Sequence, residues 1–135
     1  MAISSLLEDK FPTIAESGDT NELTIASSAT EDAKGSWTEV FAATAAEWLS
    51  LTVQTTPKTS GDIAIVFFLD IGVGAAGSEV VTIPNIKLVH HSGDSSEFQF
   101  PIKIPAGSRI AARTANSNDS VARNITLNMQ GFYIQ

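Results

Sequence analysis

The chain has 135 residues, of which 43% are hydrophobic and 17% charged, a composition typical of one folded domain and not of a disordered chain. It has no cysteine, which excludes a disulfide framework, a thiolate nucleophile and a cysteine-based zinc site. The formal net charge of −7 disfavours binding to nucleic acid. No apolar run is long enough to span a membrane and the N-terminus lacks the pattern of a secretory signal, so we expect neither a membrane partner nor secretion.

The first 50 residues carry the acidic excess. Nine carboxylates accompany two lysines there, whereas acids and bases balance over the rest of the chain. Such a segment is either a solvated acidic surface or an arm that docks on a basic patch of a partner. Within it, Ser4–Lys10 predicts one or two helical turns that Pro12 stops. We expect residues 1–30 to form an N-terminal arm and first strand, and residues 31–135 to form the main domain.

After the predicted helical turns, short apolar runs alternate with turn residues such as glycine, proline, asparagine and aspartate. These runs predict eight strands: Glu22–Ala29, Ser36–Ala43, Glu47–Thr55, Asp62–Ile71, Glu79–Val89, Ser96–Ile104, Arg109–Thr114 and Arg123–Ile134. Eight short strands without helices between them favour an all-β fold, an antiparallel β-sandwich of jelly-roll-like type.

The run Asp62–Ile71 is apolar on both faces of its predicted strand. Val66 and Phe68 lie on one face, and Phe67 and Leu69 on the other. A strand with one face in water alternates apolar with polar residues, so this strand needs cover on both sides, from its own chain or from a neighbouring molecule. We therefore expect Val66 and Phe68 to belong to an assembly interface.

Trp48 is a further candidate for that interface. In the strand Glu47–Thr55, Leu51 and Val53 share the core face, so the alternation directs Trp48 away from the core. The indole is then either buried under a loop or exposed as an interface anchor, a role that tryptophan favours.

Arg109 and Arg113 are four residues apart on one predicted strand and therefore share a face. Their guanidinium groups either form forked pairs with acids of a neighbouring subunit or remain solvated. We count both as candidate interface residues.

Two other features imitate functional motifs. Gly72–Gly77 matches the dinucleotide-binding fingerprint, but β-branched residues and Pro84 follow it, so the required helix cannot start there. His90 and His91 are adjacent and point to opposite faces of a strand, so they do not easily share a metal ion. The sequence shows no nucleophile–base pattern, and we expect no enzymatic activity, no catalytic residue, no metal and no cofactor.

Three segments, Lys34–Thr44, Leu69–Glu79 and Phe100–Arg113, resemble stretches of structural proteins of tailed bacteriophages. The resemblance covers roughly residues 34–113, with the segments in the usual order, and implies a virion β-sandwich module. Such modules include capsid cement or decoration subunits and modules of head or tail fibres, and no catalytic residues belong to the pattern.

Together these observations predict a capsid decoration protein on the outer surface of a virion, made in the host cytoplasm. Its expected partners are the major capsid protein and further copies of itself, with a trimer as one candidate assembly. The alternative is a receptor- or carbohydrate-binding module of a tail or head fibre, which needs aromatic side chains in a groove.

Overall fold

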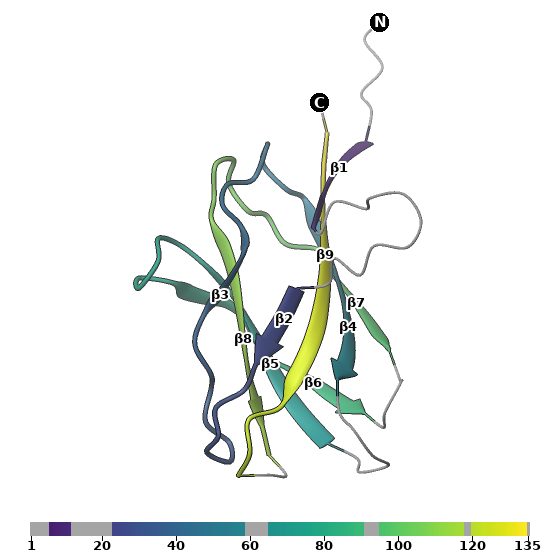
Figure 1. The fold of residues 1–135 in the computed structure, drawn as a ribbon. Helices are drawn as coiled ribbons and strands as arrows, with labels where there is room; N and C mark the ends of the chain where they lie inside the picture. The colour runs from purple at the N-terminus through teal and green to yellow at the C-terminus, as the bar shows by residue number, and fades with distance from the viewer. Residues whose placement is uncertain (1–5, 12–22, 59–64, 91–94, 118–119, 135) are drawn as a thin grey trace, which may run out of the picture.

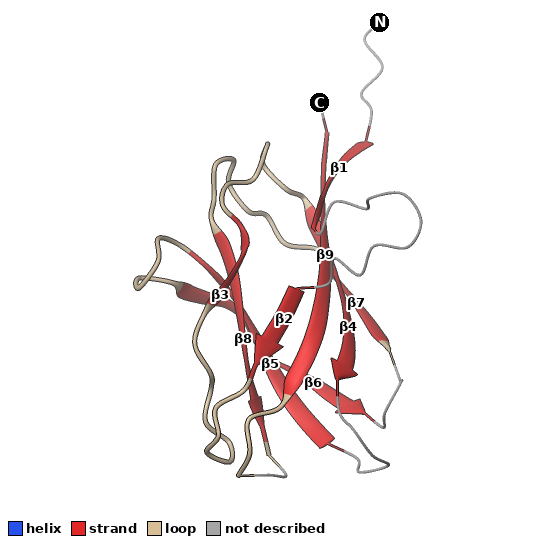
Figure 2. Cartoon of the chain, in the orientation of Figure 1, coloured by secondary structure: helices blue, strands red, loops and turns tan. Residues whose placement is uncertain are grey.

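The computed structural model describes residues 6–11, 23–58, 65–90, 95–117 and 120–134. Within these ranges the chain is built from strands and loops (Figures 1 and 2). The strands are β1 (Leu6–Phe11), β2 (Leu23–Ala26), β3 (Thr38–Phe41), β4 (Ser50–Lys58), β5 (Ile65–Val73), β6 (Val80–His90), β7 (Ser96–Phe100), β8 (Ile110–Asn116) and β9 (Asn124–Ile134). The predicted all-β class is confirmed, and β2 to β9 correspond to the eight predicted strands.

The strands form two antiparallel sheets. In the first sheet, β9 pairs with β4 on one side and with both β1 and β2 on the other, and β7 follows β4. The second sheet has the order β3-β8-β5-β6. From β2 onward, β5 and β6 are the only described strands that follow each other in the chain and also lie in the same sheet. Every other connection between these strands leads to the opposite sheet. The result is an antiparallel β-sandwich, as predicted.

The core lies between the sheets and follows the period-two pattern of the strands. Its largest fully buried aliphatic and aromatic side chains come from both sheets: Ile25, Trp48, Leu51, Ile65, Phe67, Leu69, Ile71, Leu88, Ile104, Ile110, Ile125 and Leu127. Each sheet thus supplies the apolar cover that the other requires.

Trp48 is part of this core, so its expected orientation away from the core is wrong. The residue precedes β4 and forms an isolated bridge with Ile104, and its indole meets the ring of Phe41 edge-on at 5.0 Å. Space for the indole comes from Gly131 of β9, where a Cβ atom would overlap the ring. Alternation within β4 does not extend to a residue that lies outside the strand. Being fully buried, Trp48 presents no surface to a partner.

The N-terminal segment also departs from its prediction. Residues Leu6–Phe11 form strand β1 along β9 and not helical turns. A helix of one or two turns is marginal by itself, whereas pairing with an exposed edge satisfies backbone groups on both strands. The expected arm is thus in part a strand of the first sheet, and β2 covers the next part of the same edge.

Candidate functional site

The outer face of the second sheet holds most of the residues that the sequence marks as unusual. A short segment, Lys34–Trp37, runs beside the edge of β8, and the side chains of Lys34 and Trp37 reach over this face; we call the segment the strap. Gly35 fixes its position: the Gly35 N–H donates to the carbonyl of Thr114, and the Cα atom lies so close to the carbonyl oxygen of Ala26 that a Cβ atom would overlap it. The strap gives β5 part of its outer cover from its own chain.

Asp70 of β5 anchors the strap. The carboxylate is 3% exposed and accepts hydrogen bonds at both oxygens. Oδ1 accepts from Lys34 Nζ at 2.8 Å and from the Asn85 N–H at 2.9 Å, and Oδ2 accepts from Arg113 Nε at 3.0 Å. Lys34 Nζ also donates to the Phe68 carbonyl and to Asn85 Oδ1, both at 2.9 Å. One buried carboxylate therefore joins the strap to β5, β6 and β8.

Burial by itself raises the pKa of the Asp70 carboxyl, but the hydrogen bonds from Lys34, the Asn85 N–H and Arg113 outweigh burial and hold the pKa below its ordinary value of 3.8. Because the folded pKa is depressed, ionised Asp70 stabilises the fold fully above that ordinary value. The contribution is lost as the pH falls from 3.8 through the folded pKa.

We therefore expect the free energy of unfolding to fall on acidification below the ordinary pKa of Asp70, and to fall less in Asp70→Asn, which has no carboxylate to protonate there. Urea unfolding from pH about 5 to about 2 measures both curves. Parallel curves for the two proteins would contradict this role of Asp70.

Trp37 at the end of the strap packs against β5 at Gly72. A Cβ atom at Gly72 would lie 2.6 Å from Trp37 Cη2, so glycine is needed for this close approach. The Arg113 guanidinium carbon lies 4.4 Å from the centroid of the Trp37 ring, which places a cation on the ring. The outer face of the sheet is thus closed here by an aromatic ring and a charged group.

A second ion cluster closes the turn between β5 and β6. Arg109 Nε donates to Glu39 Oε2 at 2.7 Å, and Arg109 Nη1 donates to Glu79 Oε1 at 2.8 Å and to the Gly74 carbonyl at 3.2 Å. The other oxygen of Glu79 accepts from the Gly77 N–H. A hydrogen bond from its own backbone N–H, together with Arg109, holds the pKa of Glu79 below its ordinary value. The glycine-rich run is therefore a braced turn between two strands, and strand β6 follows it where the dinucleotide motif requires a helix.

Arg109 and Arg113 do share a face, but their acidic partners belong to the same chain. Both side chains are thus neither fully solvated nor dependent on a neighbour for a partner, and a contact of Arg109 or Arg113 with a neighbouring subunit stays a prediction. Spacing along a strand predicts the face on which a side chain lies, whereas the position of its partner depends on how distant segments pack.

The three segments that carry the resemblance described in the sequence analysis meet on this face. Lys34, Trp37 and Glu39 come from the first segment and Arg109 and Arg113 from the third. Asp70, Gly72 and Glu79 of the second lie between them and join them through the ion pairs and the ring contact described above. These segments therefore form an internal frame of the sandwich.

Apolar surface is left exposed mainly along β6, an edge strand of the second sheet. Of the five large hydrophobic side chains that are exposed among the described residues, three lie on β6: Val80 (69% exposed), Val81 and Val89 (54%). Val89 lies directly opposite Val66 of β5, and Phe68 is two residues further along β5. Val66 and Phe68 are half-buried. Val80 and Val81 lie at the start of β6 and Val89 lies near its end, so the exposed valines form two separate sites along one edge strand. We call these five residues together the β6 surface.

The β6 surface contains two predicted interface residues, Val66 and Phe68, and three that sequence reasoning did not single out. Alternation placed the valines of β6 on a strand but could not show that this strand lies at an edge. Pro84 and Asn85, which has a φ of 51°, interrupt β6 in its middle, so the free edge is not a continuous pairing template.

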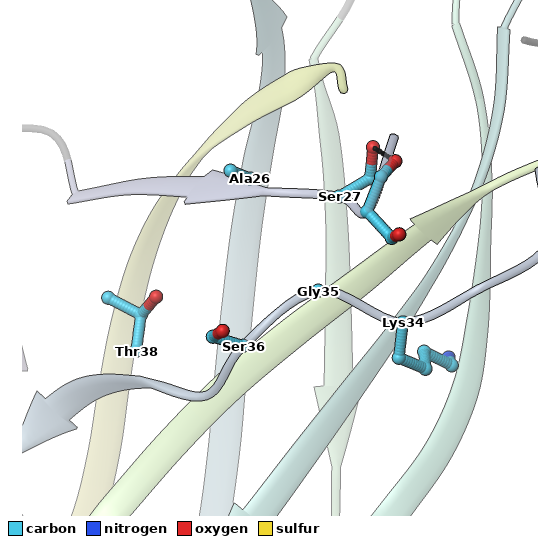
Figure 3. A pocket seen from close by; sticks show the side chains of 7 residues that line it. Ala26, Ser27, Lys34, Gly35, Ser36 and Thr38 are labelled. Atoms are coloured by element: carbon cyan, nitrogen blue, oxygen red, sulfur yellow. Dashed lines mark hydrogen bonds between the residues drawn. The ribbon is translucent and has the colours of Figure 1, made fainter. Parts of the chain in front are cut away.

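A cleft of about 410 Å³ lies beside the end of β2 and the strap, which touch at Ala26 and Gly35 (Figure 3). Hydroxyl groups of Ser27, Ser28, Ser36 and Thr38 line it beside Lys34. Much of this polarity is already used: Ser27 Oγ accepts from Asn116 Nδ2 and from the Arg123 N–H and donates to the Ser28 carbonyl. The geometry is that of a braced junction between the sheets.

Among the described residues, no group of three or more acidic or histidine side chains could hold a metal ion. Of the two adjacent histidines considered from the sequence, His91 lies outside the described residues. The described ranges contain no helix with the length and apolar character required to cross a membrane.

No family model and no curated protein sequence matches the chain. Among solved structures, one of infectious bursal disease virus, Gx strain, is similar with a TM-score of 0.51 and 12% identity, covering 97% of this chain and 33% of that one. A structure from work on Bacillus endospore appendages, described as disulfide-linked pili, aligns with a TM-score of 0.44 and 10% identity, covering 98% of this chain and 90% of that one. This chain spans about a third of the viral chain, and the likeness shows a shared fold alone.

Proposed function

We propose that this chain is a virion structural protein, a capsid decoration protein of a tailed bacteriophage that binds the major capsid protein at the outer surface of the shell. The observation that carries the proposal is the joining of the three phage-like segments into one frame. Lys34, Asp70 and Arg113, one from each segment, meet in a single ion cluster. The resemblance thus corresponds to a three-dimensional unit and not to three unrelated stretches.

In this proposal the protein acts through its surface and not through catalysis. The β6 surface is the best candidate for the contact, because it collects exposed valines on a strand that has a free edge. Burying one valine side chain fully contributes about 1.5–3 kcal/mol. Small exposed sites of this kind give a modest affinity for each copy, and contacts with several capsid subunits at once would multiply it.

The test is a paired substitution, Val80→Glu with Val89→Glu, in the full chain. We expect the variant to keep its fold, since both side chains are exposed, and to lose at least about tenfold in affinity for capsid shells that lack the protein. Co-sedimentation of protein with purified shells measures the binding.

Val121→Glu is the matched control, because Val121 is also 54% exposed but lies outside β6. It should bind shells like the unmodified protein. Equal binding by all three proteins would reject the β6 surface, and failure of the unmodified protein to bind shells would reject the decoration function. Binding to host cells or glycans instead would favour the receptor-binding alternative.

A further inference from the structure

One edge of β9 is covered by two separate strands of the same chain. β1 pairs with the later half of β9, from Phe11 opposite Met129 to Leu6 opposite Ile134. β2 pairs with the earlier half, from Leu23 opposite Leu127 to Ala26 opposite Asn124. Both are antiparallel to β9, so they run in the same direction, one after the other, along a single edge (Figure 1).

The connection between these two strands is much longer than their positions require. Eleven residues, 12–22, separate Phe11 from Leu23 in the sequence. Their partners on β9, Met129 and Leu127, are only two positions apart, which is about 7 Å along a strand. A chain of that length can reach about 35–40 Å when extended. The covalent link therefore does not confine β1 to the β9 of its own molecule.

The edge of β9 beside β1 requires a strand. The Ser27 N–H donates to the Arg123 carbonyl, so odd-numbered residues of β9 direct their backbone groups toward the edge that β1 and β2 share. By the same alternation, the N–H and carbonyl groups of Met129, Gly131 and Tyr133 point to β1. Any copy without its own β1 in place would leave these groups unpaired, at a cost that a strand from another copy removes.

We propose that β1 is exchanged between copies, so that Leu6–Phe11 of one molecule pairs with Met129–Ile134 of a second. The partner is a second copy of this chain, because its β9 has the same sequence. It therefore offers β1 the same register that β1 already has with the β9 of its own molecule. The hydrogen bonds are the same in both arrangements, so exchange costs little beyond the entropy of association. High local concentration, as on an assembled surface, favours it.

The absence of native cysteine allows a direct test by disulfide formation. Lys10 pairs with Gln130, an even-numbered residue of β9, so this is a non-hydrogen-bonded pair whose close Cα atoms suit a disulfide. Full-length Lys10→Cys and Gln130→Cys proteins are mixed, unfolded and refolded together at high concentration, and then oxidised. Exchange predicts a disulfide-linked pair that contains one chain of each kind, identified by mass spectrometry after non-reducing electrophoresis.

Two controls set the background. Gln54 and Glu97 form the corresponding non-hydrogen-bonded pair of β4 and β7, with their side chains in contact at 2.5 Å. β4 and β7 are interior segments tied to the second sheet at both ends, so a mixture of Gln54→Cys and Glu97→Cys should form no mixed pair. A mixture of Lys10→Cys with Gln54→Cys, which are not register partners, should form none either.

The double variant Lys10→Cys with Gln130→Cys tests whether β1 stays on the β9 of its own molecule. If it forms only intrachain disulfides at every concentration, and the mixed single variants give no more mixed pairs than the controls, exchange is rejected and β1 belongs to its own molecule. Should the first pair fail to fold by circular dichroism, Leu6→Cys with Ile134→Cys decides the question, since Ile134 is 55% exposed.

Discussion

Replacing Gly131 with alanine is expected to destabilise the protein by about 3 kcal/mol, which lowers Tm by about 10 °C. An added Cβ atom would overlap the Trp48 indole, and that ring is fully buried against Phe41 and cannot move aside into solvent. Alanine is otherwise the better residue in a strand, because glycine is the more costly residue to order. The loss therefore reports the clash and not strand propensity. Thermal unfolding followed by circular dichroism measures it.

The same Gly131→Ala change in a protein without the Trp48 indole shows whether the clash with that ring causes the loss of stability. In Trp48→Leu the indole is absent, so a further Gly131→Ala change should be neutral or slightly stabilising, although Trp48→Leu by itself costs stability through the cavity it leaves. The sign of the Gly131→Ala effect thus depends on residue 48, which a double-mutant cycle shows as a large coupling energy. Equal losses from Gly131→Ala in both backgrounds would contradict the packing described here.

Asp70→Asn is expected to cost about 2–4 kcal/mol at neutral pH. The asparagine side chain keeps the shape of the carboxyl, but it replaces one acceptor oxygen by an NH2 group that faces donors of Lys34 or Arg113. Two cations then lose the buried negative charge between them. Chemical unfolding in urea at pH 7 measures the change.

Glu39→Gln is the matched comparison, because it also removes one carboxylate from an ion pair of this face. The side chain of Glu39 is half exposed, so its pairing with Arg109 is screened by water and the expected loss is at most about 1 kcal/mol. Similar losses for Asp70→Asn and Glu39→Gln would mean that burial of Asp70 does not strengthen its interactions.

Local patterns in the sequence predicted the eight strands of the sandwich well, because turn residues and alternation act over a few positions. The prediction of helical turns at Ser4–Lys10 failed for a related reason. Local propensity carries no information about a free edge of β9 that lies more than 100 residues away in the sequence.

The candidate site was predicted only in part, since it depends on contacts between distant segments. The need for cover on the Val66 and Phe68 face was visible in the sequence, but the strap that provides part of this cover was not. The common face of Arg109 and Arg113 was likewise visible, whereas their partners Asp70 and Glu79 could be recognised only once the strands were aligned.

The position of β9 affects how the protein can form during translation. β9 pairs with β1, β2 and β4, and all three are synthesised before it. Until β9 has emerged from the ribosome, β1, β2 and β4 have no strand that joins them into one sheet. The second sheet does not wait for β9, because its four strands, β3, β5, β6 and β8, have all emerged once Asn116 has been synthesised. A nascent chain that stalls before β9 cannot close the sandwich, and its exposed strand edges would make it a substrate for chaperones and proteases.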